Sequence, residues 1–484
     1  MTGYCLPVPD PVLPVADAEA VTAERAGPKA ATLARLRRAG LPVPDGFCVA
    51  ADVYRAQLSA AGLAQATGRV AQAAQPEAGR LALEVRLGLH QAPLSAGLEA
   101  GIRVAYQRLS AELGPLVAVR SSALCEDTSV ASFAGQLETI LAVANEAELV
   151  SAVRACWASL WSSRAMRYAK ARGADPARTA MAVLVQRLVL ARMAGGVLSR
   201  TSDGHLLVTA AWGLGPAVAQ GALVPDRYLL RREGPVLEGV EPGSKTHLLS
   251  CSAGGDLRWQ AVTSDLVTAS CLSEAEAVAL ARLALAAEAL LGSAVEIEWA
   301  LDDEGFWILQ ARPLVVEPRR PGNRLWLGEL ALTGQPAGSG SAAGLARVVR
   351  SEAELARVGM GEVLVTRVPG PALAAVLPLV AGVVAELGGS TSHLAALARE
   401  RGIPAVLGAR GATRRIPDGS LVLVDGNEGV VYWIPDERPP MLLTGSRERE
   451  KTQHPGAASP REINWRGNFC AQELGSAKSR YVLP

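Results

Sequence analysis

The chain has 484 residues, of which 49% are hydrophobic and 20% charged, so it can form about three domain-sized units with sizeable cores. Its 48 basic and 47 acidic side chains nearly cancel, and aromatic residues make up only 4%, which argues against nucleic acid or an anionic lipid surface as a partner. No apolar run approaches the ~20 residues that cross a bilayer, so no membrane association is expected.

The first ten residues and the cysteines both favour a cytoplasmic protein. The N-terminus lacks a basic segment followed by an apolar core, so we expect no signal peptide. The seven cysteines are scattered and form no Cys-x-x-Cys pair, which is typical of reduced thiols rather than of disulfides or a zinc site.

Helical and strand-like segments are mixed along the chain, which predicts an α+β or α/β fold. Helical periodicity marks residues 22–38, 98–112, 146–173 and 273–291, and Ser273 with Glu276 forms a capping box at the start of the last segment. Strand-like apolar runs occupy residues 117–119, 182–189, 206–211, 295–301, 306–310, 363–365, 382–385, 421–424 and 430–433.

The most informative segment begins at Gly388, reads Gly-Gly-Ser-Thr-Ser-His, and places His393 at the start of a predicted short helix. Thr391 or Ser392 suits the N-cap of this helix, and Gly402 suits its C-terminal end. The free N–H groups of a helix start bind phosphate and disfavour a cationic ring. We therefore expect a neutral, nucleophilic His393 at about pH 7, and the alternative is a surface histidine beside a glycine turn.

The sequence around His393 resembles the phosphohistidine segment of the phosphoenolpyruvate-utilising mobile domain. That segment combines Gly-Gly-x-x-Ser-His with Ala-Arg-Glu-x-Gly-Ile-Pro-Ala-Val, and this chain has both patterns at residues 388–393 and 398–406. The resemblance implies that Nε2 of His393 accepts a phosphoryl group, and that the surrounding domain swings on its linkers to an acceptor.

Two basic residues stand where phosphate oxygens could bind. Lys29 lies at the start of a predicted helix, and Arg120 ends the apolar strand 117–119 before a loop of small residues. Arginine presents a planar fork of donors, and such loops offer N–H groups and hydroxyls. The alternatives are a solvated Lys29, and an Arg120 that pairs with Glu126 or Asp127.

Glu298 and Gln310 lie on two neighbouring predicted strands that an acidic turn at residues 302–305 connects. Their oxygens could converge on Mg²⁺, which prefers hard oxygen ligands and also binds substrate phosphates. Arg312 would then compensate negative charge on a transferred phosphoryl group. The alternative is a solvent-exposed hairpin with one ion pair.

Taken in chain order, these clusters resemble the ATP-grasp nucleotide domain of the dikinase-type phosphotransferases, over roughly residues 21–313. The resemblance implies catalytic roles for His393, Arg120 and Arg312, a Mg²⁺ site at Glu298 and Gln310, and ATP contacts from Lys29, Arg120, Gly135, Thr139, Gln186, Glu298, Gln310 and Arg312. Pro28 and Pro216 replace the family's usual glycine and glutamate, and residues 195–202 lack its usual Phe-Thr and Asn-Pro.

The implied fold is a two-part ATP-grasp nucleotide domain joined to a small swivelling β/β/α phosphohistidine domain. The Pro-, Gly- and Ser-rich composition near residues 317–344 predicts a linker, and the polar composition after residue 435 predicts a loosely ordered tail. The predicted division is ATP-grasp subdomains at 1–190 and 191–318, a linker at 319–344, the phosphohistidine domain at 345–436 and the tail at 437–484.

The function implied by the resemblance is a phosphotransferase that passes the β-phosphoryl group of ATP through phospho-His393 to a small-molecule hydroxyl, amine or carboxylate, and releases AMP and phosphate. Only about fifty residues follow the phosphohistidine unit, whereas the barrel that holds the acceptor in synthase-type relatives needs roughly 250. A partner subunit that supplies the acceptor site, or a nucleotide-binding regulator without turnover, remains an alternative.

Overall fold

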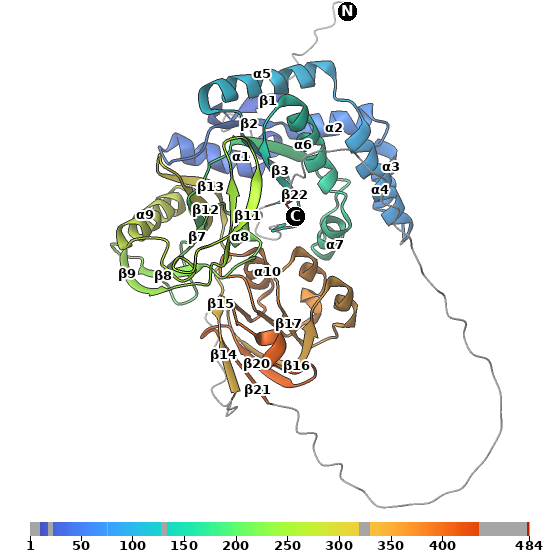
Figure 1. Cartoon of the computed structure of the whole chain (residues 1–484). Helices are drawn as coiled ribbons and strands as arrows, with labels where there is room; N and C mark the ends of the chain where they lie inside the picture. Colours follow the sequence, from blue (N-terminus) through green and yellow to red (C-terminus); the bar gives the residue numbers. More distant parts are fainter. Residues whose placement is uncertain are drawn as a thin grey trace, which may run out of the picture.

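The computed structural model describes residues 10–17, 23–74, 76–126, 133–318, 330–434 and 482–483. Within these residues, strands form two six-stranded sheets, an eight-stranded sheet and a separate hairpin. The first two sheets and their helices form the upper part of Figure 1, and the eight-stranded sheet forms the lower part. Helices and strands are mixed, which confirms the predicted α/β class.

The first sheet has the order β1-β2-β5-β3-β4-β22 and is antiparallel throughout. Its strands are β1 (Val12–Pro14), β2 (Gly46–Val49), β3 (Val117–Ala123), β4 (Thr139–Val143), β5 (Met181–Arg187) and β22 (Val482–Leu483). In the described part of this unit the helices are α1 (Ala23–Arg38), α2 (Ala51–Ala60), α3 (Ala64–Val70), α4 (Glu77–Gln91), α5 (Ala96–Leu113), α6 (Glu146–Ser159) and α7 (Ser163–Ala171). A core of buried aromatic residues lies between sheet and helices, where the indole of Trp161 donates to the hydroxyl of Tyr54 at 2.8 Å.

The last two residues of this sheet come from the opposite end of the chain. Val482 pairs with Ile140 and Leu483 with Thr139, so β22 extends the sheet at the edge formed by β4. Residues 482–483 of the predicted tail therefore form a strand, and its residues 437–481 and 484 lie outside the described residues.

The single helix predicted over 146–173 is wrong, because the structure divides it into α6 and α7. The side chain of Ser162 accepts a hydrogen bond from the backbone of Ala165 and caps a new helix. Serine competes in this way with an uninterrupted helical backbone, and the polar caps outweigh the apolar periodicity here.

Helix α1 contains a kink that positions Lys29. Gly27 has φ +77°, a left-handed conformation that favours glycine, and Pro28 follows it. Proline suits a first helical turn because its missing N–H has no partner there in any case. Lys29 therefore lies at the start of the straight part of the helix, as the sequence predicts.

The second sheet has the order β13-β12-β6-β7-β8-β9 and is also antiparallel. Its strands are β6 (Met193–Leu198), β7 (Leu206–Trp212), β8 (Asp226–Arg231), β9 (Val236–Glu241), β12 (Val295–Leu301) and β13 (Phe306–Pro313). The hairpin β10 (His247–Cys251) and β11 (Leu257–Ala261) and the helices α8 (Pro216–Ala219) and α9 (Glu274–Leu291) complete the unit. The predicted capping box of Ser273 and Glu276 is confirmed at the start of α9.

The third sheet has the order β14-β21-β20-β16-β17-β18-β19-β15, with a parallel centre from β16 to β19. Its strands are β14 (Leu330–Thr333), β15 (Gln335–Gly338), β16 (Ser341–Val349), β17 (Val363–Thr366), β18 (Gly382–Ala385), β19 (Ala405–Leu407), β20 (Leu421–Asp425) and β21 (Val430–Ile434). It carries the helices α10 (His393–Arg401) and α11 (Ala412–Arg415).

Within the predicted linker, most of residues 330–344 form β14, β15 and the start of β16, and 319–329 lie outside the described residues. The small residues that suggested flexibility have a packing role. A Cβ atom at Gly338 would lie 2.2 Å from the carbonyl oxygen of Ile403, so only glycine allows β15 to approach the neighbouring backbone.

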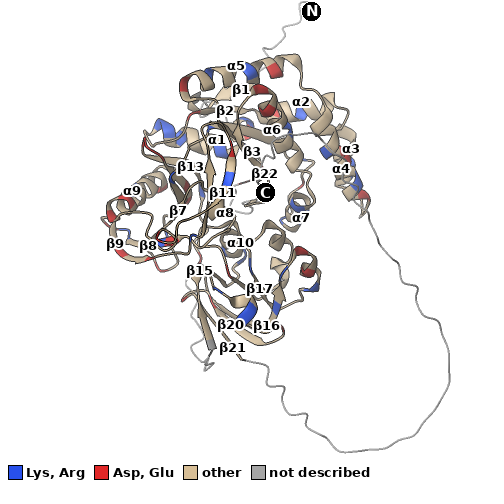
Figure 2. Ribbon diagram, viewed as in Figure 1, with Lys and Arg blue, Asp and Glu red and all other residues tan. Residues whose placement is uncertain are grey.

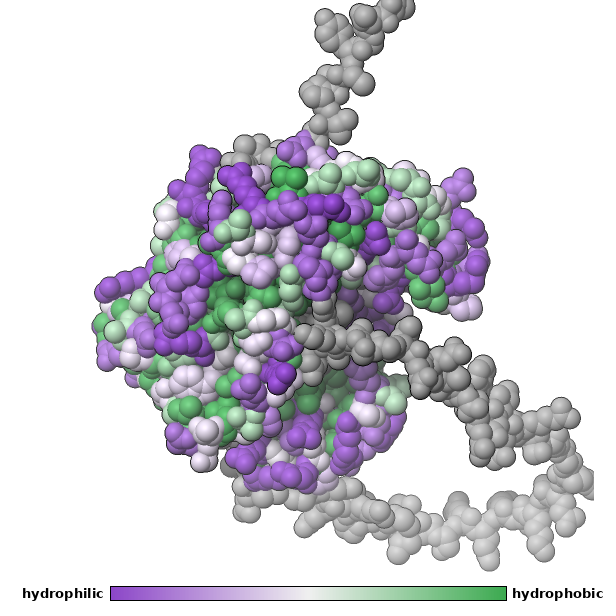
Figure 3. Space-filling model, turned by 45° about the horizontal axis from the view of Figure 1, so that its top comes forward, coloured by the Kyte–Doolittle hydropathy of each residue, from purple (hydrophilic) through white to green (hydrophobic). Residues whose placement is uncertain are grey.

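Basic and acidic residues are interspersed along the ribbon in both the upper and lower parts of the molecule (Figure 2). The face seen in Figure 3 likewise mixes hydrophilic and hydrophobic residues. None of the helices that the structure describes combines the length and apolar character needed to cross a membrane.

Candidate active site

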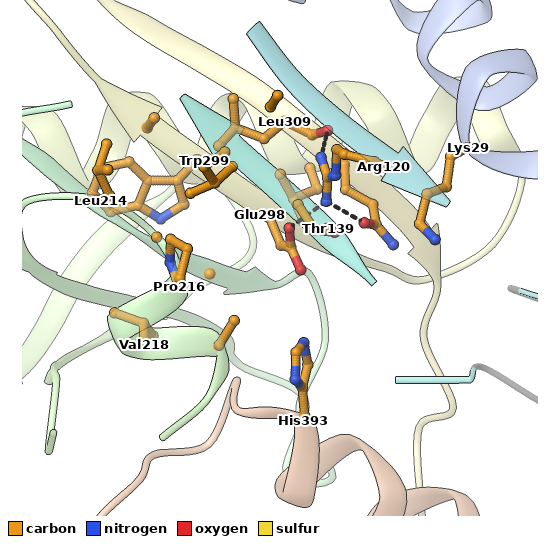
Figure 4. A pocket seen from close by; sticks show the side chains of 18 of the residues that line it. Lys29, Arg120, Thr139, Leu214, Pro216, Val218, Glu298, Trp299, Leu309 and His393 are labelled. Carbon is orange, nitrogen blue, oxygen red and sulfur yellow. Dashed lines mark hydrogen bonds and ion pairs between the residues drawn. The ribbon is translucent and has the colours of Figure 1, made fainter. Parts of the chain in front are cut away.

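A cavity lies where the two sheets of the upper part meet the start of α10 (Figure 4). All nine residues that the sequence singled out line it: Lys29, Arg120, Gly135, Thr139, Gln186, Glu298, Gln310, Arg312 and His393. They come from α1, β3, the loop before β4, β4, β5, β12, β13 and α10, and therefore from the units built on all three large sheets.

Arg120 connects the first sheet to the second. Its Nη2 atom donates to Oε2 of Glu298 at 2.9 Å and to Oε1 of Gln310 at 2.6 Å, and its Nη1 atom donates to the carbonyl of Leu309 at 2.6 Å. Glu298 and Gln310 are direct partners in the β12–β13 register, so their side chains share one face. The alternative pairing of Arg120 with Glu126 is wrong, and Asp127 lies outside the described residues.

Glu298 stays ionised in this setting. Burial raises the pKa of its carboxyl, but Arg120, and then His393 and Arg312, lower it more, so the pKa lies below its ordinary value. The Glu298 side chain is still 36% exposed, so its carboxylate remains accessible from the cavity.

Lys29 is held by protein groups at the same end of the cavity. Its Nζ atom donates to the carbonyl of Ser121 at 2.8 Å and forms a short ion pair with Glu126. Lys29 is only 7% exposed, so the alternative of a solvated lysine is wrong. Because both partners are fixed, the ammonium group has a defined position beside Arg120.

His393 begins α10 and points into the cavity toward Glu298 (Figure 4). Ser392 caps the helix, with its hydroxyl accepting from the backbone of Ala395, and Gly402 ends it in the left-handed conformation that the sequence predicts. Burial lowers the pKa of His393 to about 4, with Arg312 and Lys29 adding to the effect and Glu298 opposing it. The ring is therefore neutral at neutral pH, and the alternative of a surface histidine is wrong.

The cavity has a polar end and an apolar end. Lys29, Arg120 and His393 lie at one end in Figure 4, and Leu214, Pro216 and Val218 lie toward the other. Other apolar residues that line the cavity are Leu141, Leu188, Val189 and Ala300. A polarised cavity of this kind suits a ligand that combines phosphates with a flat organic group.

The sequence interpretation missed Glu296, which also lines the cavity. Its Oε1 atom accepts from Arg312 at 3.1 Å, and its Oε2 atom accepts from Arg399 of α10 at 3.0 Å. Glu296 lies two residues before Glu298 on β12, and side chains two apart share one face of a strand. This spacing was the signal that could have identified it.

The lower part of the molecule meets the upper part closely around His393. The hydroxyls of Thr391 and Thr209 are 2.6 Å apart. Elsewhere, glycines permit the close approach, because a Cβ atom at these positions would collide with the opposite part. An added Cβ at Gly135 would lie 2.8 Å from Nδ1 of His393, and one at Gly196 would lie 2.7 Å from Cβ of Thr391. At Gly221 it would lie 2.3 Å from Pro369, and at Gly389 2.6 Å from Pro225.

Comparison with known proteins identifies the family. The family described as pyruvate phosphate dikinase, AMP/ATP-binding domain, matches residues 23–325, which is more than half of the chain. This chain belongs to the pyruvate phosphate dikinase AMP/ATP-binding family. The family described as PEP-utilising enzyme, mobile domain, matches residues 358–429, which contain His393. The predicted dikinase-type family, and its two-part nucleotide domain joined to a mobile domain, are confirmed.

Relatives of this dikinase-family chain include proteins named phosphoenolpyruvate synthase. The one from Aeropyrum pernix is 33% identical over 84% of this chain and 56% of its own length. A probable phosphoenolpyruvate synthase from Archaeoglobus fulgidus is 33% identical over 87% and 58%, and the synthase from Deinococcus radiodurans is 34% identical over 82% and 54%. The chain thus spans just over half the length of these relatives.

Proposed function

We propose that this chain transfers a phosphoryl group from ATP to Nε2 of His393. The observation that carries the proposal is the position of His393, whose neutral ring lies at the polar end of a cavity that also contains Arg120 and Lys29. A neutral imidazole has the lone pair that covalent catalysis through histidine requires.

The cavity residues divide by chemistry into two groups. Lys29, Arg120 and Arg312 would bind phosphate oxygens and stabilise charge on the transferred group, which is the main requirement of phosphoryl transfer. Thr139 would add a hydroxyl donor, and Gly135 would leave room for the reacting groups. Gln186 is buried on β5 and would border the base, together with the apolar lining residues.

Glu298 and Gln310 would hold Mg²⁺. Both present oxygen atoms, both point at the same nitrogen of Arg120, and the carboxylate of Glu298 is ionised. This set fits a cation that takes few protein ligands and completes its shell with water and phosphate oxygens. When bound, the cation would neutralise charge on the phosphate oxygens.

The family resemblance supports retention of the β-phosphoryl group. Nε2 of His393 then forms a bond to the β-phosphorus, and the bond between that phosphorus and the oxygen it shares with the α-phosphate breaks. One water is consumed when the γ-phosphoryl group leaves as phosphate, so ATP and water yield phospho-His393, AMP and phosphate.

The acceptor is proposed from the relatives. Because proteins named phosphoenolpyruvate synthase match both domains, we propose that phospho-His393 delivers its group to pyruvate. The aligned residues cover only 56% of the length of the Aeropyrum pernix relative. The pyruvate site would correspond to the part of that relative outside the alignment. The unit at 330–434 would swing to that site, with residues 12–187 and 193–313 as the two ATP-grasp subdomains.

A labelling experiment tests the transfer to His393. ATP labelled at the β-phosphate should give an acid-labile phosphoprotein and one AMP per labelled chain, and His393→Ala should give neither. His247→Ala removes an exposed histidine on β10 and should label like the parent chain. Equal labelling of His393→Ala and the parent chain would disprove the proposed carrier.

A further inference from the structure

Two consecutive residues of α10 contact different halves of the upper part, which we call the nucleotide unit. One half is built on the first sheet and the other on the second sheet. Nη2 of Arg399 donates to Oε2 of Glu296, which lies on β12 of the second sheet, at 3.0 Å. Oε2 of Glu400 accepts from Nη2 of Arg172 at 2.7 Å and from the hydroxyl of Tyr168 at 3.0 Å. Tyr168 lies in α7 and Arg172 follows its last turn, so this contact is made with the first-sheet half.

These contacts are largely buried, so their energy depends strongly on the position of α10 against both halves of the nucleotide unit. The side chains of Arg399, Glu296 and Glu400 are 8–11% exposed, and that of Arg172 is 17% exposed. Exposed ion pairs contribute little, but removal of one partner from a buried pair leaves a charge without compensation. Removal of one partner while α10 stays docked would thus leave a poorly solvated charge at the interface.

The same residues control the position of the histidine loop. Nη1 of Arg399 donates to the carbonyl of Ser390 at 2.5 Å, three residues before His393. One guanidinium therefore ties that loop to β12. Glu400 anchors the opposite end of the nine-residue helix, about 10 Å from His393 along the axis. The contact of Arg399 with the loop before α10 and the contact of Glu400 near the far end of the helix together fix the direction in which α10 points.

We propose that Arg399 and Glu400 are positioning residues that form a docking clamp, which seats α10 on both halves of the nucleotide unit at once and so holds His393 at the polar end of the cavity. Figure 1 shows α10 at the junction where the upper and lower parts meet. Because the clamp needs Glu296 and Arg172 together, His393 reaches the cavity only when the two halves stand as they do here. The clamp's value to catalysis rests on the proposed transfer to His393.

A spectroscopic titration tests the clamp without any turnover. In the full chain, with histidine ring carbons labelled and His393 assigned by its loss in His393→Ala, docked His393 should titrate near 4 and an undocked ring near the ordinary 6.5. The charged groups that face the ring are Glu298, Arg312, Glu296 and Lys29, and Glu400 is not among them. Glu400→Gln should therefore shift the titration toward 6.5 through loss of docking alone.

The matched control is Glu362→Gln, which removes one partner of the ion pair between Glu362 and Arg347 inside the lower part of the molecule. This variant should leave the His393 titration unchanged. If Glu400→Gln and Glu362→Gln both titrate like the parent chain, the docking clamp is disproved.

Kinetics separate positioning from general damage. With β-labelled ATP, Glu400→Gln and Arg399→Gln should each label His393 about tenfold more slowly, as expected for loss of one charge-assisted contact, with the ATP KM within twofold of the parent value. Arg399→Lys should recover part of the rate. A raised KM with an unchanged rate constant would overturn the positioning role, whereas an unlabelled parent chain with an intact titration shift would overturn only the proposed transfer.

Discussion

A Cβ atom added to Gly135 would lie 2.8 Å from Nδ1 of His393. This glycine also has φ +67°, so a substitution would both strain the backbone and occupy the space of the imidazole. The loop before β4 and the start of α10 thus pack closely at the ring of His393, whose other nitrogen, Nε2, is the proposed nucleophile.

Gly135→Ala should therefore slow labelling of His393 by at least tenfold, because the methyl group displaces the ring from the cavity. Phosphorylation by β-labelled ATP in a single turnover measures the effect. Gly204→Ala is the matched control, since Gly204 has φ +90° with nothing within 4 Å of an added Cβ. Equal slowing in both variants would mean that backbone strain, and not the contact with His393, causes the loss.

The depressed pKa of His393 predicts how docking depends on pH. The docked ring has a pKa of about 4 and an undocked ring about 6.5, so a proton binds preferentially to the undocked form. The docked form keeps its full advantage above pH 6.5 and loses it progressively between 6.5 and 4. The labelling rate at saturating ATP should be level from about pH 8 to 6.5 and then fall, with a midpoint between 4 and 6.5. A midpoint above 6.5 contradicts this account.

Glu298→Gln should weaken the proposed cation site. The substitution keeps the shape of the side chain and removes the negative charge, so the Mg²⁺ concentration for half-maximal labelling should rise by about tenfold, and a chelator should abolish labelling in both proteins. Titration of labelling against Mg²⁺ provides the measurement. Glu304→Gln, on the exposed turn between β12 and β13, is the control that should behave like the parent chain.

A buried ion pair supports the second sheet away from the cavity. Lys245 and Asp226 have fully buried side chains, and Asp226 also accepts from the backbone of Gly243 and Cys271. Lys245→Met should lower the free energy of unfolding by about 3–5 kcal/mol, because it leaves a buried carboxylate without its cation. Denaturant unfolding measures this loss. The double variant Lys245→Met with Asp226→Asn should be less destabilised than Lys245→Met alone. If Lys245→Met were as stable as the parent chain, the proposed contribution of the ion pair would be disproved.

The sequence predicted which side chains gather in the cavity better than it predicted the strands around them. Lys29, Arg120 and His393 each follow a local signal, a helix start, a strand end and a glycine turn respectively, and Glu298 lies on a strand of a predicted hairpin. Such signals are readable without knowledge of tertiary contacts. The assembly of these groups in one cavity depends on pairings across long stretches of chain, such as Arg120 with Gln310. Only the family resemblance connected them in advance.

The errors have the opposite origin. The Gly- and Pro-rich segment before β16 suggested flexibility, but Gly338 has no side chain because a neighbouring carbonyl occupies that space. The pairing of Val482 with Ile140 joins residues more than three hundred positions apart, and no local pattern marks it. Strand pairing and close backbone packing are properties of the folded chain, so composition alone did not predict the strands within 330–344 or at 482–483.

The glycines at the contact between the two parts have a consequence for repeated use of the enzyme. Gly135, Gly196 and Gly221 present bare backbone to the opposing side chains, and a glycine has no rotamers to lose when the surfaces meet. Long side chains at these positions would lose up to about 2 kcal/mol each in rotamer freedom at every encounter. If the unit at 330–434 swings as proposed, a surface without them would join and separate at little entropic cost. The few charged contacts of α10 would then set the balance between the docked and undocked positions.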